Sequence, residues 1–426
     1  MSTIETTAPT RGGTRRRHAS ASAGSTPTRS APVDAEAETE TETDLAGTDL
    51  SAPDLAGTDP LTTADQRSLH EYLLLTRAVE ERGVRLYKQG KIPGSFYDGR
   101  GQEATSVGAA FALGPDDVIS SPLIRDLGAH LVRGTDLTEL FRHYMGRENA
   151  LSHGREGNIH FGDRRLGIVG PVSMLPDMMV VAVGLAMGFR IRGEQRIALS
   201  FFGDGSTSRG DWHEAMNLAG LRREPVVLVC ENNQLAYSTP TAQQFRVRPA
   251  GRAAGYGVAS EVVDGNDVVA VFDAVRRARE RALDGGGPTL IEAETMRMHG
   301  HGAHDDARYV DPELRASWEA RDPIDAHAKV ARAHGIDVEA LRIEVDERVA
   351  VAVKAAAATP LPDPATATEG VFCVGEPAGL GRGVAPFSGF AATATGTAGS
   401  SSAGTPTAAG PTATADPSTA QTPQAA

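Results

Sequence analysis

Apolar and polar residues along the middle of the chain follow the pattern of buried strands separated by helices. Residues 197–202 and 225–230 have the length, branching and continuous apolarity of fully buried strands. Between them, residues 206–223 place apolar side chains at mostly helical spacing. A strand, a helix and a strand in this order form a crossover unit with two parallel strands. The pattern predicts an α/β fold, with a mostly parallel sheet covered by helices on both faces.

Further elements are expected on either side of this unit. Helices are predicted at residues 64–90, 104–113, 137–145, 177–192 and 268–284. Strands are predicted at residues 117–121, 260–263 and 289–296, and a loop at 151–171. Asn266 is expected to cap the helix that follows it. In the helix at 177–192, Ala182, Gly184, Ala186 and Gly188 are expected to allow close packing against the sheet.

The two ends of the chain differ in composition from its middle. Residues 1–60 are rich in Thr, Ser, Ala, Pro and Gly, and residues 391–426 consist almost wholly of Ala, Thr, Gly, Ser, Pro and Gln. Such segments bury too little apolar surface to offset the entropy of ordering. The sequence predicts disordered tails at 1–60 and 386–426, and one folded domain at 61–385.

Charge and cysteine content narrow the class of protein. The net charge is −13 and no basic stripe is present, which excludes a nucleic-acid partner. The longest apolar stretch, 178–189, is too short to span a membrane. Two cysteines, Cys230 and Cys373, do not make a disulfide framework. We therefore expect a cytoplasmic protein without a membrane partner.

Polar signatures follow both strands of the central unit. Gly203-Asp204-Gly205 follows the first strand and Asn232-Asn233 the second, with the 26 residues 206–231 between them. Ligands of parallel sheets bind outside the carboxyl ends of the strands, where both signatures fall. Carboxylate and amide oxygens suit Mg²⁺ or Ca²⁺, and a helix opening at Ser206 would favour an anion. Each signature alone is typical of a turn, but together they predict a metal and diphosphate site.

With this pair of signatures, the chain resembles thiamine diphosphate enzymes. More narrowly, residues 65–330 are similar to the alpha subunit of the first, decarboxylating component of 2-oxo acid dehydrogenase complexes. The resemblance implies a thiamine diphosphate-binding fold with thiamine diphosphate and Mg²⁺ as cofactors. It implies oxidative decarboxylation of a 2-oxo acid, with acyl transfer to a lipoyl group.

The resemblance also assigns the metal and phosphate ligands. It implies that Asp204, Asn233 and the backbone carbonyl of Leu235 hold the metal. The N–H groups of Gly205 and Ser206 would face the diphosphate. The family often has tyrosine at position 235, but a carbonyl ligand does not depend on the side chain.

Further cofactor contacts follow from matching motifs. Arg125 matches an arginine that contacts the diphosphate, although the tyrosine that precedes it in the family is Ile124 here. Backbone groups of Gly167 and Val169 match a glycine-rich strand beside the aminopyrimidine ring. These positions are carried over from the family and not from spacing in this chain.

A histidine-rich loop follows the last predicted strand. By resemblance His301 is the catalytic candidate, and His299 is a weaker second. A histidine with a pKa near neutrality can donate a proton or stabilise a developing charge. Three histidines in six residues could alternatively bind a metal. Gly302 stands where animal relatives have a phosphorylated serine.

Two aspartates follow these histidines. We expect Asp305 and Asp306 to hold the loop by ion pairs with Arg297 or Arg308.

The family also needs a glutamate from a second domain, for which this chain has no room. The resemblance therefore implies a separate beta subunit in an α₂β₂ assembly and a lipoyl acyltransferase partner. The substrate stays open between pyruvate and a branched-chain 2-oxo acid. An acetoin dehydrogenase alpha subunit, the diphosphate half of a split transketolase and a non-catalytic binding module are the alternatives.

Overall fold

The computed structural model describes residues 61–370, 372, 379–380 and 383–390. The predicted tail at 1–60, most of the predicted tail at 386–426, and Cys373 lie outside these residues. Within the described part, no helix is long and apolar enough to cross a membrane.

Six parallel strands form the main sheet. Their spatial order is β2-β1-β3-β4-β8-β7. Their bounds are Val118–Ser120 for β1, Ile168–Val169 for β2, Ala198–Gly203 for β3, Val226–Asn232 for β4, Ala259–Asp264 for β7 and Thr289–Glu294 for β8. The two strands of the predicted crossover unit, β3 and β4, are direct neighbours, and Gly203 pairs with Glu231. Both polar signatures therefore follow strand ends at the same edge of the sheet.

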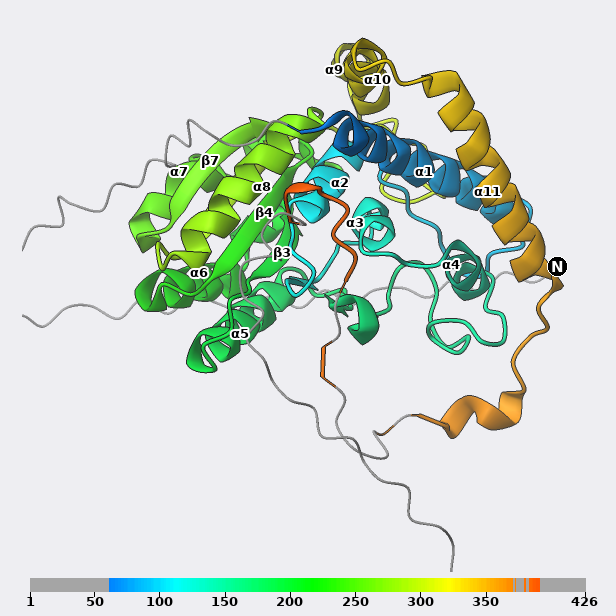
Figure 1. The fold of residues 1–426 in the computed structure, drawn as a ribbon, viewed down its shortest axis with the longest axis horizontal. Coiled ribbons are helices and arrows are strands. Elements are labelled where there is room, and N and C mark those ends of the chain that lie inside the picture. Colours follow the sequence, from blue (N-terminus) through cyan, green and yellow to red (C-terminus); the bar gives the residue numbers. More distant parts are fainter. Residues whose placement is uncertain (1–60, 371, 373–378, 381–382, 391–426) are drawn as a thin grey trace, which may run out of the picture. The chain divides into compact units, whose positions relative to one another are not determined.

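Helices cover both faces of the sheet (Figure 1). Their bounds are α1 Thr63–Lys88, α2 Glu103–Phe111, α3 Leu127–Val132, α4 Leu137–Tyr144, α5 Asp177–Ile191, α6 Gly210–Arg222, α7 Pro249–Ala253, α8 Val268–Leu283, α9 Pro312–Glu319, α10 Pro323–Ala333 and α11 Val338–Ala358. Alternate residues of β3 divide between two cores, because side chains alternate along a strand. Leu199 and Phe201 face the core that contains α2 and α8, whereas Ala198 and Phe202 face the core that contains α5 and α6. The predicted α/β fold is confirmed.

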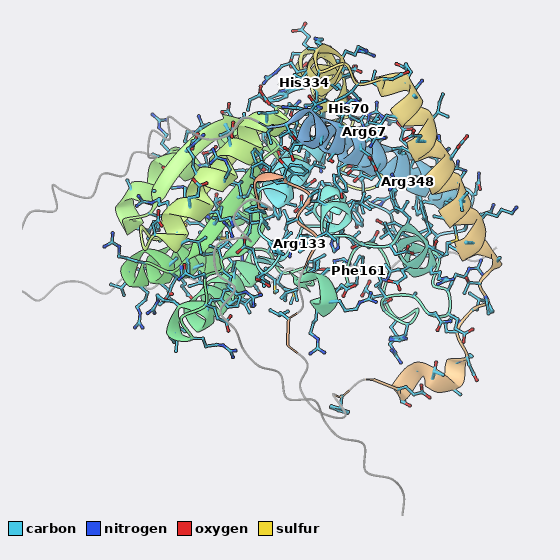
Figure 2. All side chains as sticks on the ribbon, viewed as in Figure 1. Arg67, His70, Arg133, Phe161, His334 and Arg348 are labelled. Atoms are coloured by element: carbon cyan, nitrogen blue, oxygen red, sulfur yellow. The ribbon has the colours of Figure 1, made fainter. Side chains whose placement is uncertain are left out.

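A third apolar cluster lies away from the sheet, among α1, α4 and α11. At the surface of this cluster, Glu71 of α1 binds Arg67 and Arg348, so ion pairs reinforce the contact between α1 and α11 (Figure 2). These pairs are partly exposed, and such pairs contribute little to stability beside the apolar cluster that they border.

One arginine lies in the interior, close to the start of β1. Arg133 is buried and donates hydrogen bonds to the carbonyls of Gly114, Pro115, Asp117 and Leu166 (Figure 2). A buried charge is tolerated when its hydrogen bonds are satisfied. Arg133 thus joins the turn before β1 to the turn before β2, which fixes the edge of the sheet.

Two local predictions are wrong. The helix expected to open at Ser206 begins at Gly210, because Asp204–Ser208 forms a 3₁₀ turn first. The cap of α8 is Asp267, whose side chain accepts from two backbone N–H groups of the first turn. Asn266 is instead held by Thr295 and by the carbonyl of Arg321.

The prediction for the small residues of α5 is correct for the two alanines and wrong for the two glycines. Gly184 is exposed, Gly188 is half-buried, and an added Cβ at either position would meet nothing within 4 Å. Ala182 and Ala186 are the small residues that pack into the core on the sheet side. The two glycines therefore lie away from the sheet. The expected loop at 151–171 contains the short strand β2.

The last described segment returns to the start of the domain. The ring of Phe387 packs against Phe111 and Phe272. Ser388 donates to Asp65 from its backbone N–H at 2.8 Å and from its hydroxyl at 2.6 Å. The boundary predicted at residue 385 therefore falls within a described segment that packs on the core.

Candidate functional site

A cavity of about 540 Å³ lies at the carboxyl edge of the sheet. It is lined by residues that follow β1, β3, β4 and β8, and by a loop before α5. These are Leu123, Ile124, Arg125, Ser173, Met174, Leu175, Gly203, Asp204, Gly205, Ser206, Arg209, Glu231, Asn233, Leu235, Ala236, Tyr237, Arg297 and His301. The structure therefore brings most of the predicted site residues to one cavity.

Asp204 is the carboxylate at the end of β3. It is 1% exposed, and Gln244 Nε2 donates to its Oδ2 at 2.7 Å. Burial raises the pKa of Asp204 to about 6, and the bond from Gln244 opposes this rise. A buried carboxylate with so few partners is poorly compensated. The position therefore suits a cation.

Asn233 and Leu235 follow β4. Asn233 Nδ2 donates to Gln102 Oε1 at 3.0 Å, and the backbone N–H of Leu235 donates to Asn233 Oδ1 at 3.2 Å. Leu235 lies in β5 (Leu235–Ala236) and pairs with Pro240 of β6 (Thr239–Pro240). Because proline has no N–H, Pro240 cannot donate to the carbonyl of Leu235.

Gly205 lies where the turn after β3 meets β5. A Cβ at this position would lie 2.5 Å from the Cβ of Ala236. Only glycine allows this close approach. The backbone of residue 205 is thus held against the hairpin that carries Leu235.

Arg125 follows β1 and is 7% exposed. Its Nη2 donates to the carbonyl of His301 at 2.7 Å. Its Nη1 is buried and has no hydrogen-bond partner among the described residues. Arg125 lines the cavity, and a guanidinium at a cavity wall is suited to bind an anion such as phosphate.

His301 is held by two arginines. Arg125 Nη2 and Arg297 Nη1 each lie 3.2 Å from its Nδ1. Because arginine can only donate, Nδ1 accepts and the proton of the neutral ring lies on Nε2. Burial, Arg125 and Arg297 together lower the pKa of His301 to about 4. His301 is therefore a neutral hydrogen-bond donor at pH 7.

The loop around His301 is fixed by further hydrogen bonds. Asp305 accepts from the N–H of His301 at 2.7 Å and from the hydroxyl of Tyr309 at 2.6 Å. Arg297 donates to the same hydroxyl at 2.8 Å. Asp306 pairs with Arg308 at 2.9 Å, as expected. Asp305 thus holds the loop by hydrogen bonds, and the predicted ion pair is formed by Asp306.

The structure separates His299 from His301. His299 Nδ1 lies 2.8 Å from Asp98 Oδ1, and both residues line a smaller cavity of about 250 Å³. Within the described ranges, no group of three His, Cys, Asp or Glu residues is placed to hold a metal. The alternative of a histidine metal site is therefore not formed. A metal at the larger cavity would need amide and carbonyl oxygens beside Asp204.

Gly167 and Val169 do not line the cavity. Their carbonyls accept from the N–H groups of Ile119 and Ser121, at 3.0 and 3.1 Å. The N–H of Gly167 donates to the carbonyl of Arg164. These groups serve the sheet edge, and their assignment to the aminopyrimidine ring gains no support from the geometry.

Two buried carboxyls beside the cavity were not predicted from the sequence. Asp126 and Glu231 are 0% and 1% exposed. Burial and the nearby Asp126 raise the pKa of Glu231 well above its ordinary value, and burial raises the pKa of Asp126 to about 6. Ionisation of Asp126 therefore opposes ionisation of Glu231. The signal that could have found them is a glutamate that continues the apolar run of β4.

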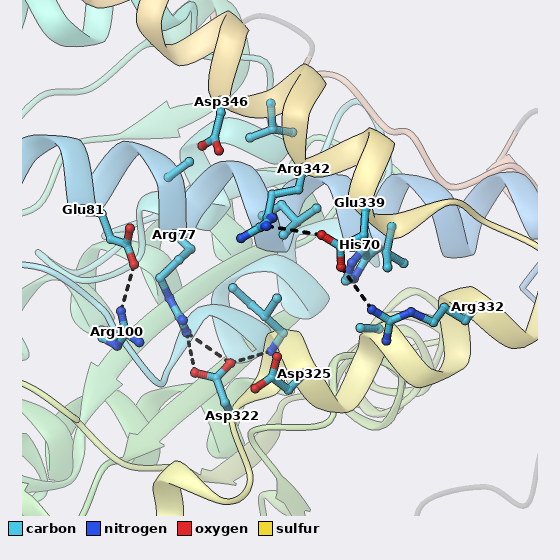
Figure 3. Close-up of a pocket in the computed structure, with 16 residues that line it drawn as sticks. His70, Arg77, Glu81, Arg100, Asp322, Asp325, Arg332, Glu339, Arg342 and Asp346 are labelled. Atoms are coloured by element: carbon cyan, nitrogen blue, oxygen red, sulfur yellow. Dashed lines mark hydrogen bonds and ion pairs between the residues drawn. The ribbon is translucent and has the colours of Figure 1, made fainter.

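Another cavity, of about 390 Å³, lies among α1, α10 and α11 and is shown in Figure 3. Its charged side chains pair with one another: Arg77 with Asp322 at 3.0 Å, and Arg332 with Glu339 at 3.4 Å. None of the predicted site residues lines it. The cavity at the sheet edge is therefore the candidate site.

Comparisons with known proteins agree with this choice. The sequence model of the family described as "Dehydrogenase E1 component" matches residues 71–365. The 2-oxoisovalerate dehydrogenase subunit alpha of Bacillus subtilis is 38% identical over 248 residues, which cover 58% of this chain and 75% of that protein. The pyruvate dehydrogenase E1 component subunit alpha of Staphylococcus aureus is 33% identical over 299 residues, which cover 70% of this chain and 78% of that protein. The chain therefore belongs to the dehydrogenase E1 component family, among the alpha subunits of 2-oxo acid dehydrogenases.

Proposed function

We propose that the chain binds thiamine diphosphate and Mg²⁺ and catalyses, with a partner subunit, the oxidative decarboxylation of a 2-oxo acid. The acyl group would pass to a lipoyl group on an acyltransferase. One observation carries the proposal: the predicted metal ligands Asp204 and Asn233 follow adjacent parallel strands and line one cavity with Arg125 and His301.

The donor set fits the cofactor. Asp204 supplies one charge, and Asn233 Oδ1 and the carbonyl of Leu235 supply neutral oxygens, which together suit Mg²⁺. Arg125, which lines the cavity, would bind the diphosphate with the N–H groups of Gly205 and Ser206. The bound cofactor supplies the electron sink for loss of CO₂.

His301 orients the substrate in this proposal. Because Nδ1 accepts from Arg125 and Arg297, the Nε2–H is left to donate to an oxygen of the 2-oxo acid. The cavity wall formed by Leu123, Met174 and Leu175 is apolar and would exclude water from the reacting carbon.

An apolar face of α5 supports a partner subunit. Val180, Val181 and Ile191 are 37%, 40% and 68% exposed. Gly184 and Gly188 leave open space beside them. An exposed apolar face of this kind marks a protein interface. We assign it to a beta subunit in an α₂β₂ assembly, which would complete the cofactor site.

The substrate is a 2-oxo acid, either pyruvate or a branched-chain acid, since relatives of both kinds are similar to this chain. An acetoin dehydrogenase alpha subunit, with the same site, is the alternative. Assays of the αβ complex with pyruvate, 3-methyl-2-oxobutanoate and acetoin, using a dye acceptor, distinguish these substrates.

Calorimetry of the αβ complex tests the site itself. Titration with thiamine diphosphate and Mg²⁺ is expected to show binding by the wild type and a large loss of affinity in Asp204→Ala. Equal affinity in both proteins would refute the metal assignment and the proposal that rests on it.

A further inference from the structure

Gln102 makes two side-chain hydrogen bonds in the interior beside the cavity, although it does not line it. It is 1% exposed and precedes α2, where its side chain makes no capping bond. Its Nε2 donates to Glu231 Oε2 at 2.8 Å, and its Oε1 accepts from Asn233 Nδ2 at 3.0 Å. One side chain thus joins the end of β4 to the residue that follows it.

One group that can only donate determines which atoms donate and which accept in this series of hydrogen bonds. The backbone N–H of Leu235 can only donate, so Asn233 presents Oδ1 to it and turns Nδ2 toward Gln102. Gln102 must then present its oxygen to Asn233 and its amide N–H to Glu231. Glu231 accepts this bond through Oε2. The orientation of the Asn233 amide therefore determines the orientation of the Gln102 amide.

The acceptor at the other end of this series of hydrogen bonds, Glu231, is also held in place. Glu231 is 1% exposed and belongs to β4, which pairs with β3 on one side and β8 on the other. Its Oε2 accepts the bond from Gln102. The acceptor at this end is therefore held by the sheet.

Resting on the proposed function, we propose that Gln102 is a positioning residue for the metal site. It holds the amide of Asn233 so that Oδ1 lies on the side of Leu235, the other predicted oxygen ligand from this segment. Without Gln102, Asn233 Nδ2 would lose its partner. The amide could then rotate and present nitrogen, which does not bind Mg²⁺, where oxygen is required.

The test is a Mn²⁺ titration, followed by electron paramagnetic resonance, of the assembled αβ complex saturated with thiamine diphosphate. Gln102→Met keeps the length of the side chain but removes both bonds. Loss of a partner that orients a metal ligand costs about 10–100-fold in affinity, and we expect a loss of this size.

The matched control is Gln66→Met. Gln66 is also buried, but its partner is His327 of α10, and neither residue lines the site cavity. We expect this variant to be destabilised while its Mn²⁺ affinity is unchanged. Should Gln102→Met fail to assemble, the titration uses Gln102→Asn, which is too short to reach both partners and should show the same loss.

Wild-type affinity in Gln102→Met, or an equal loss in Gln66→Met, would overturn the positioning role and leave the metal site intact. If instead the wild-type complex bound Mn²⁺ no better than Asp204→Ala, the proposed function would fail and the positioning role with it. The two failures are therefore distinguishable in one series of titrations.

Discussion

The buried carboxylate of Asp204 should destabilise the metal-free chain, so removing its charge should stabilise the fold. Asp204→Asn is the sharpest form of this change, because the asparagine keeps an oxygen that can accept from Gln244. The variant loses the charge and retains the shape. Its stability therefore reports the penalty of burying the carboxylate.

The magnitude follows from the pKa of Asp204, which burial raises from 3.8 to about 6. One pKa unit corresponds to about 1.4 kcal/mol, so the ionised carboxylate destabilises the folded state by about 3 kcal/mol. The raised pKa means that the folded state binds the proton more tightly than the unfolded state. The penalty is therefore absent below the unfolded pKa, grows between the two pKa values, and is complete above about pH 6.

Urea unfolding of the purified chain, in EDTA and without thiamine diphosphate, measures this effect. We expect Asp204→Asn to be more stable than the wild type by about 3 kcal/mol at pH ~7.5, with a difference that vanishes near pH ~4. Asp346→Asn, at an exposed position of α11, is the control and should behave as the wild type. A difference of the same size at both pH values would refute the electrostatic reasoning, and a destabilised Asp204→Asn would refute the burial penalty itself.

Two further predictions concern the loop and the interface. In steady-state assays of the αβ complex, His301→Ala should lower kcat by about 100-fold or more, as expected for loss of a catalytic donor. His299→Ala should leave kcat near the wild-type value, because His299 lies in the smaller cavity. Equal losses of kcat in the two variants would contradict the separation of the two histidines. Gly184→Trp should abolish assembly with the beta subunit. The variant chain alone should melt at the wild-type temperature, since a side chain at this position meets open space. An intact complex in size-exclusion chromatography would argue against the interface on α5.

Much of the fold could be predicted from periodicity, because buried parallel strands and amphipathic helices have distinct spacings. The strands that carry Asp204 and Asn233 were expected side by side, and they pair in register. The family resemblance is also confirmed by the comparisons. The residue pattern was a sufficient guide wherever the structure of a segment depended on that helix or strand alone.

Features that depend on several segments could not be predicted in this way. Burial, Arg125 and Arg297 lower the pKa of His301, and the two arginines come from different loops. His299 binds Asp98, 201 residues earlier in the chain. The role of Gln102 depends on a partner 131 residues away. No spacing along the sequence reports such contacts, because they arise only when the elements pack.

The bond between Asp65 and Ser388 has a consequence for the connectivity of the domain. Asp65 also accepts from Thr62, so one carboxylate joins the first turn of α1 to the last described segment. The first helix and the last described segment are therefore joined through Asp65, with Phe387 packed nearby. A circular permutant that links these ends by a short peptide and opens the chain at the exposed Gly285 turn should retain the fold. The order in which the elements leave the ribosome would then change, while the cavity at the sheet edge would stay the same.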